Sequence, residues 1–146
     1  MARDDFEALR LENQLCFPLY ACARETVKRY KPFLDEIGLT YTQYITMMVL
    51  WEHRQVTSKA LGEKLYLDSG TLTPVLKKLE EKGLVTRARD PQDERNLIVT
   101  LTDAGEALKV PAAGIPHKMA ACVRLSRKDV QTLRTLLLRL LSGGLE

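Results

Sequence analysis

The order of elements between residues 56 and 102 constrains the fold more than any other feature of the chain. Residues 56–85 place apolar side chains at helical spacing in two short stretches separated by a polar turn. Residues 84–90 and 96–102 then alternate apolar and polar side chains, as strands do, and the charged segment DPQDER joins them as a hairpin. Two helices, a turn and a hairpin in this order predict a winged helix-turn-helix, a mainly α fold with a small β-hairpin wing (α+β).

Polar residues and glycine set the bounds of these two helices. Thr57 or Ser58 can cap the first helix, and Asp68 or Ser69 can cap the second. Gly83 can end the second helix. The positions expected to face the core are Leu61, Leu65, Leu72, Val75, Leu76 and Leu79. A helix over residues 42–53 precedes them, with its expected inward side chains at Ile45, Met48, Val49 and Trp51.

The first part of the chain, residues 4–37, is predicted as one long helix. Its apolar stripe recurs at steps of four and three residues, at Leu11, Leu15, Leu19 and Cys22. Pro32 and Gly38 mark its end. Pro18 lies inside it, and an interior proline removes one main-chain hydrogen bond, so we expect a kink just past Cys16. Such a kink either loosens the packing around the thiol or is a tolerated bend.

The last part of the chain is also helical. Thr102 can cap a helix that Pro111, Gly114 and Pro116 interrupt, and we expect helix to resume over residues 118–125. A final helix follows a capping motif at Ser126, with its apolar stripe at Val130, Leu133, Leu136, Leu137, Leu140 and Leu141.

These elements predict one domain, residues 1–146, in which a winged helix-turn-helix (40–102) lies between two helical regions (1–38 and 103–146). The first and last helices are strongly apolar and lie outside the central module. In a chain this short, their best burial is against each other and against a second copy. The sequence therefore predicts a homodimer in which these two regions form the interface.

Charge and composition limit what such a protein can do. The net charge is only +3, so a surface that binds DNA must arise from the arrangement of side chains and not from bulk charge. No apolar run reaches the ~18 residues of a membrane span, and the start of the chain has no apolar signal core. We therefore expect a soluble cytoplasmic protein with no membrane partner. The three cysteines are irregularly spaced and form no zinc motif, so neither a metal nor a cofactor is expected.

The second helix of the module is the one that enters the major groove of double-stranded DNA in this fold. Its expected base-facing residues are Ser69, Gly70, Thr71, Thr73 and Pro74, while Lys77 and Lys78 would reach phosphates. Hydroxyls can donate to bases, glycine allows close approach, and a proline ring can touch a thymine methyl. In the wing, Arg95 can enter the minor groove with Asp93 bracing its guanidinium.

Each of these residues also has a plain structural interpretation. Residues 69–73 can serve as an ordinary helix start, and Arg95 can be a solvated arginine paired with Asp93 or Glu94. DNA binding is favoured because the wing and the recognition helix occur together in the right order.

Cys16 is the candidate reactive group. Tyr20 lies four residues on, on the same helical face and within ~6 Å. Tyr30 lies about 21 Å further along the axis, so it can reach Cys16 only from an antiparallel copy. We expect a composite site, with Cys16 from one subunit and Tyr30, with or without Tyr20, from the other. A thiolate attacks peroxide to give a sulfenic acid, and phenols that donate hydrogen bonds stabilise the thiolate.

A second thiol can capture the sulfenic acid as a disulfide. Cys22 lies ~9 Å along the same helix, whereas a disulfide needs Cα atoms within about 7 Å. Cys122, from the other subunit, is therefore the better resolving cysteine. The alternative is that each cysteine is a small buried structural residue.

The segments LENQLCFPLYACARE, YKPFLDEIGLTYTQY, GEKLYLDSGTLTPVLKKLEEKGLVTR and DERNLIVTLT resemble the OhrR branch of the MarR family. The resemblance covers nearly the whole chain. It implies a homodimeric bacterial repressor of a thiol peroxidase gene, with organic hydroperoxide as the oxidant that releases operator DNA. The sensing cysteine carries over to Cys16, and its hydrogen-bonded tyrosines carry over to Tyr20 and Tyr30. The implied DNA contacts are Ser69, Gly70, Thr71, Pro74, Asp93 and Arg95.

The branch has one-cysteine members, which form a mixed disulfide with a small thiol, and two-cysteine members, which form an intersubunit disulfide. Cys122 stands where the resemblance places the second cysteine, which favours the two-cysteine type. Two other functions compete with redox repression. One is a MarR-type repressor released by a small aromatic ligand, with structural cysteines. The other is a thiol peroxidase, but no Arg or Thr near Cys16 forms a peroxide-activating motif, so we expect no enzyme.

Overall fold

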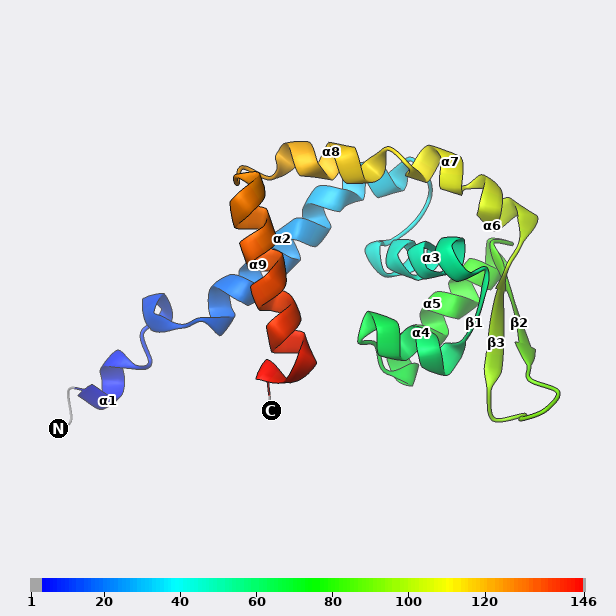
Figure 1. Ribbon diagram of the computed structural model, residues 1–146, viewed down its shortest axis with the longest axis horizontal. Coiled ribbons are helices and arrows are strands. Elements are labelled where there is room, and N and C mark those ends of the chain that lie inside the picture. The colour runs from blue at the N-terminus through cyan, green and yellow to red at the C-terminus, as the bar shows by residue number, and fades with distance from the viewer. Residues whose placement is uncertain (1–3, 146) are drawn as a thin grey trace. The chain divides into compact units, whose positions relative to one another are not determined.

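The computed structural model describes residues 4–145 and divides into two compact units, one up to Ile115 and one from Pro116 on. In the first unit, three helices gather beside a small antiparallel sheet (Figure 1). The helices are α3 (Tyr41–His53), α4 (Ser58–Leu65) and α5 (Ser69–Glu81). The strands are β1 (Gln55–Thr57), β2 (Val85–Arg89) and β3 (Leu97–Leu101). This arrangement is a winged helix-turn-helix, as predicted.

The hairpin β2–β3 forms the wing, and its register pairs Val85 with Leu101 and Arg89 with Leu97. β1 adds to the other edge of β3, so the strand order is β1-β3-β2. β1 was not predicted from the sequence, because a strand of three residues is too short to show an alternating pattern. β1 anchors the base of the wing to the helices.

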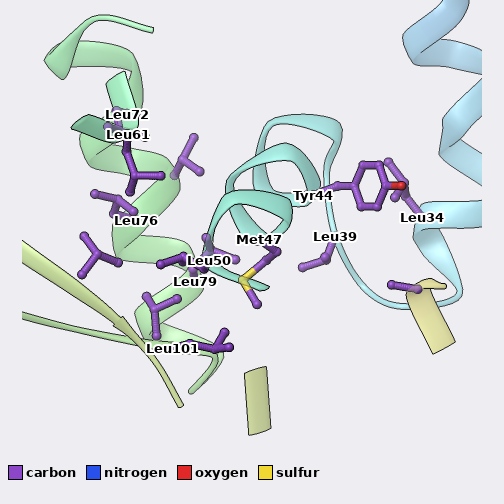
Figure 2. Packing of buried hydrophobic residues seen from close by; sticks show 14 of the residues in the cluster. Leu34, Leu39, Tyr44, Met47, Leu50, Leu61, Leu72, Leu76, Leu79 and Leu101 are labelled. Carbon is purple, nitrogen blue, oxygen red and sulfur yellow. The ribbon is translucent and has the colours of Figure 1, made fainter. Parts of the chain in front are cut away.

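The core of this unit lies between α3, α4, α5 and the sheet (Figure 2). The predicted core faces of α4 and α5 are confirmed, because Leu61, Leu76 and Leu79 are almost fully buried and the other predicted positions pack around them. The prediction of which side of α3 faces the core is partly wrong. Met48 is exposed, whereas Met47 and Leu50 are buried. Apolar side chains surround most of α3, so their spacing does not single out one inward side.

The predicted caps are present. Thr57 accepts a hydrogen bond from the Ala60 N–H, and Asp68 accepts one from the Thr71 N–H. Gly83 follows α5 with a φ of +74°, a left-handed conformation that favours glycine. These two caps fix where α4 and α5 begin, and therefore which residues occupy the first turn of α5.

The expectation of one helix over residues 4–37 is wrong. The segment contains α1 (Asp4–Glu7), a short 3₁₀ turn, η1 (Leu11–Asn13), and then α2 (Cys16–Asp35). Pro18 lies in the first turn of α2, where main-chain N–H groups have no partner within the helix, so it removes no helical hydrogen bond and the expected kink has no cause. Pro32 lies inside α2 and does not end it, and Gly38 follows the helix with a φ of +69°.

The rest of the chain is helical: α6 (Asp103–Ala107), α7 (Lys109–Ala112), α8 (Ile115–Cys122), α9 (Arg127–Arg139) and the π turn η2 (Leu140–Gly144). Thr102 caps α6 and Ser126 caps α9, as predicted. α8 begins three residues before the expected start at 118, because Pro116 occupies its first turn, where proline is tolerated.

The apolar stripe of α9 is largely exposed in the single chain. Of the predicted stripe, Val130, Leu133, Leu136 and Leu141 keep between 41% and 49% of their surface accessible, whereas Leu137 and Leu140 are partly buried. Across residues 4–145, none of the helices combines the length and the apolar character that crossing a membrane would require.

Candidate functional site

The outer face of α5 carries the residues predicted to contact DNA. Leu72, Val75, Leu76 and Leu79 turn one side of the helix into the core. The opposite side is exposed along the whole row of predicted residues: Ser69, Gly70, Thr71, Thr73, Pro74, Lys77 and Lys78. One face of α5 is therefore buried and holds the helix in place. The opposite face is accessible from the N-terminus of the helix onward.

Asp68 fixes the start of this face. Its carboxylate accepts the Thr71 N–H at 2.8 Å. Hydrogen bonds from Thr71, the side chain first and then the backbone, lower the pKa of Asp68, so this cap remains ionised at neutral pH. Among the described residues, none forms a hydrogen bond with the Ser69 side chain. Capping is thus the role of Asp68, and the Ser69 hydroxyl is available to a ligand.

A groove of about 650 Å³ runs between α4, the start of α5 and the wing. Its walls include Lys59 and Tyr66 on one side, Ser69 and Thr73 in the middle, and Arg95 on the wing side. Three separate elements thus present polar and cationic side chains to one concave surface, which also includes the carboxylates of Glu63 and Asp68. Such a surface can bind a polyanion by shape and by the placement of a few charges.

The wing holds Arg95 at its tip. Its side chain is 91% exposed, and its Nε donates to Oδ1 of Asp93 at 3.2 Å. The partner is Asp93 and not Glu94, whose main-chain oxygen instead accepts from Arg89 at 2.8 Å. Asp93 therefore orients the Arg95 guanidinium, and Arg89 ties the end of the hairpin together.

A second ion pair fastens α5 to the wing. Glu80 of α5 accepts both the main-chain N–H of Arg87, at 3.0 Å, and its guanidinium, at 3.1 Å. The side-chain hydrogen bond from Arg87 is the main cause that lowers the pKa of Glu80. This pair was not predicted, because nothing in the local pattern of the sequence indicates a contact that forms across the turn between a helix and a strand.

Cys16 is the first residue of α2, which is 20 residues long, and its thiol is exposed. The thiolate is the reactive form of cysteine, and an exposed thiol is accessible to an oxidant. The alternative of a thiol sealed inside the single chain does not hold for Cys16, Cys22 or Cys122, all of which are free and exposed. Cys122 ends α8, and its Sγ lies 3.4 Å from the main-chain oxygen of Lys118.

The two predicted tyrosines lie in different surroundings on α2. Tyr20 is 61% exposed, one turn from Cys16, and the Arg24 guanidinium lies 5.5 Å from its ring centroid. Tyr30 is half-buried, with ring centroids 4.9 Å from Tyr41 and 5.8 Å from Tyr44. Burial, and secondarily the charge of Tyr41, raise the pKa of Tyr30, so its phenol is a neutral proton donor at neutral pH.

Because α2 is unbroken from Cys16 to Asp35, Tyr30 remains about 21 Å along the helix axis from Cys16. The helix therefore does not bring these two residues together. Cys22 lies on the same helix, ~9 Å from Cys16 along the axis, and Cys122 belongs to the other compact unit. The part of the chain that the structure describes has no group of three or more His, Cys, Asp or Glu placed to hold a metal ion.

Comparison with known proteins identifies the family. The family of SarA/Rot transcriptional regulators matches residues 28–110. The organic hydroperoxide resistance transcriptional regulator of Bacillus subtilis is 48% identical over 136 residues, which cover 93% of this chain and 92% of that protein. The chain belongs to the OhrR branch of the MarR family. Its relatives are transcriptional regulators, so this OhrR-branch protein is a regulator and not an enzyme.

Solved structures of AbfR, a protein of Staphylococcus epidermidis, agree with this assignment. Reduced AbfR bound to DNA is 36% identical to the OhrR-branch chain with a TM-score of 0.79, covering 97% of this chain and 99% of AbfR. Disulfide-formed AbfR is 34% identical with a TM-score of 0.60, covering 97% of this chain and 94% of AbfR. The winged-helix fold of the regulator is thereby confirmed.

Tyr41 and Tyr44, which lie against the Tyr30 ring in this OhrR-branch regulator, were not predicted from the sequence. Their spacing of three residues on one helix indicated that they share a face. The contact with Tyr30, however, depends on how α2 packs on α3, which local spacing does not define.

Proposed function

We propose that this OhrR-branch regulator is a homodimeric repressor that binds operator DNA through α5 and the wing and releases it when an organic hydroperoxide oxidises Cys16. The observation that carries the proposal is the exposed Cys16 thiol at the start of α2, in a chain that also presents an accessible α5 face. AbfR has been solved in reduced form on DNA and in disulfide form, which supports redox control. Overoxidised AbfR has also been solved on DNA, so the disulfide is the oxidised state that we expect to release the operator.

DNA binding follows from the exposed face of α5. Ser69, Gly70 and Thr71 would meet base edges in the major groove, with Thr73 and Pro74 beside them. Lys77 and Lys78 would contact phosphates. Lys78 forms an exposed ion pair with Glu81 at 3.6 Å, and such surface pairs are weak enough to exchange for a phosphate. Arg95, braced by Asp93, would enter the minor groove.

Replacing Arg95 with alanine is expected to weaken operator binding by about 1–3 kcal/mol, the scale of one specific contact. Fluorescence anisotropy with labelled operator duplex, selected from a random pool, measures the change in Kd. Gln92→Ala, an exposed neutral change on the same wing, is the matched control and is expected to bind like wild type. Equal Kd values for Arg95→Ala and wild type would remove Arg95 from the interface.

Exposed apolar faces support the homodimer. Phe17, Leu19 and Val27 of α2 are exposed, as are Val130, Leu133 and Leu136 of α9, and exposed apolar surface is typical of association sites. In an antiparallel pair of α2 helices, Tyr30 of one subunit would reach Cys16 of the other. The Tyr30 phenol is protonated at neutral pH and can donate to a thiolate. Tyr20 would be a further donor.

The chemistry proceeds in two balanced steps. The Cys16 thiolate attacks one peroxide oxygen, the O–O bond breaks, and an alkoxide leaves and takes a proton to become an alcohol, so the sulfur becomes a sulfenic acid. A thiolate of Cys122 in the other subunit then attacks this sulfur. The hydroxide leaves as water, and an intersubunit disulfide remains. In the two steps together, the two sulfurs are oxidised and the hydroperoxide is reduced.

The direct test is the effect of cumene hydroperoxide on operator binding by reduced wild-type protein. Release of the DNA, reversed by dithiothreitol, is the expected result. Continued binding after treatment would reject redox control. Release by aromatic carboxylates, without any response to hydroperoxide, would favour the alternative of a ligand-controlled repressor.

A further inference from the structure

Lys82, at the C-terminal end of α5, connects the recognition helix to the helix that carries the reactive thiol. Its ammonium group donates to the main-chain oxygen of Gly38, just past α2, and to Oε1 of Gln43 in α3 at 3.1 Å. These acceptors are 44 and 39 residues away in the sequence. One side chain thus bridges the end of α5, the end of α2 and the start of α3.

Both acceptors belong to structures that define how α2 ends and α3 begins. Gly38 adopts the left-handed conformation that closes α2, where the Leu39 N–H donates to the Leu34 oxygen at 3.1 Å. Gln43 is buried and completes the capping box of α3, because the same Oε1 also accepts the Thr40 N–H at 3.1 Å. A shift of the α2 end relative to α3 would therefore disturb the oxygens that hold Lys82.

We infer that Lys82 is a positioning residue that transmits a movement of α2 to the recognition helix. The inference rests on the proposed redox function. The apolar packing of the core that includes Leu34, Leu39 and Leu79 is non-directional, whereas a charge-assisted hydrogen bond has a defined direction and length. When oxidation of Cys16 strains or rotates α2, the Gly38 oxygen moves, and the end of α5 must follow or lose its partner.

The Glu80–Arg87 pair provides a contrast at the same end of α5. It joins the helix to β2 and therefore lies entirely within the winged module. Its loss would alter how α5 is held against the wing in both redox states. Loss of the Lys82 contacts would instead reduce the difference in operator affinity between the reduced and the oxidised protein.

The test measures the Kd for operator DNA of the oxidised and of the reduced dimer. We call the oxidised Kd divided by the reduced Kd the coupling ratio. Lys82→Met preserves the length of the side chain and removes its charge. It is expected to lower the coupling ratio about tenfold, which corresponds to ~1.4 kcal/mol, while Cys16 is oxidised at the wild-type rate. Lys82→Arg is expected to restore most of the ratio. Glu80→Gln is expected to raise both Kd values together and leave the ratio unchanged.

Lys31→Met is the matched lysine control, since Lys31 pairs with Asp35 within α2, and it is expected to keep the wild-type ratio. A wild-type ratio in Lys82→Met would overturn this inference and leave the redox function intact. A wild-type protein that ignores hydroperoxide would overturn both.

Hydrogen exchange on wild-type protein is the second test and remains decisive if Lys82→Met does not fold. The amides of Leu39 and Leu84, which close the ends of α2 and α5, are expected to lose protection together on oxidation. Loss of protection at the Leu39 amide, with unchanged protection at the Leu84 amide, would contradict the proposed role of Lys82.

Discussion

Cys16→Ser is expected to keep the regulator on its operator after treatment with an organic hydroperoxide, whereas the wild-type protein loses affinity by about 5–150-fold, the usual range of coupling between two sites. Serine is close to cysteine in size, but its hydroxyl is not ionised at neutral pH and does not form a sulfenic acid. The exposed position of Cys16 at the start of α2 makes the substitution structurally mild. Anisotropy of labelled operator DNA measures the affinity before and after oxidation.

Cys22→Ser is the matched control, because Cys22 is also exposed and lies on the same helix. It is expected to lose the operator as the wild type does. Release of the Cys16→Ser protein by hydroperoxide would show that another group senses the oxidant. If an aromatic carboxylate released both variants equally, the cysteines would be structural and the ligand-controlled alternative would stand.

Cys122→Ser is expected to abolish the dimer-sized band that hydroperoxide produces in wild-type protein on non-reducing gels. Cys16 and Cys22 lie on one unbroken helix, ~9 Å apart along its axis, which exceeds the Cα separation of about 7 Å that a disulfide tolerates. Cys22 is therefore a poor partner within the subunit. Without Cys122, the sulfenic acid of Cys16 would persist or overoxidise, and mass spectrometry would detect the added oxygen atoms.

The same gel with Cys22→Ser is expected to show the wild-type band. Loss of the band in Cys22→Ser, with the band retained in Cys122→Ser, would assign the resolving role to Cys22 of the other subunit. A wild-type protein that forms no band but gains the mass of an added small thiol would belong to the one-cysteine type.

The sequence predicts α4 and α5 of the winged module well because each of these two helices has one apolar side. Leu72, Val75, Leu76 and Leu79 define the inner face of α5 without ambiguity, and the exposed row of predicted DNA contacts follows from it. The inner face of α3 was partly misassigned for the opposite reason. Its residues 44–51 are almost continuously apolar, so tertiary packing selects Met47 over Met48.

The N-terminal segment shows a second limit of local patterns. Proline in the first turn of a helix and proline in its interior look alike in the sequence, and only the actual start at Cys16 makes Pro18 harmless. Contacts that join distant segments are still harder to predict from the sequence. Lys82 donates a hydrogen bond to Gly38, 44 residues away in the sequence. The residues next to each of them in the sequence give no indication of this contact.

In the proposed function, oxidation of Cys16 is the event that releases DNA. The most direct measurement titrates the reduced protein–operator complex with cumene hydroperoxide and follows anisotropy together with the mass of the Cys16 peptide. The fraction of DNA released is predicted to rise together with the fraction of Cys16 oxidised and to show no release before Cys16 is oxidised. Release of the DNA while the Cys16 peptide remains a free thiol would contradict the account.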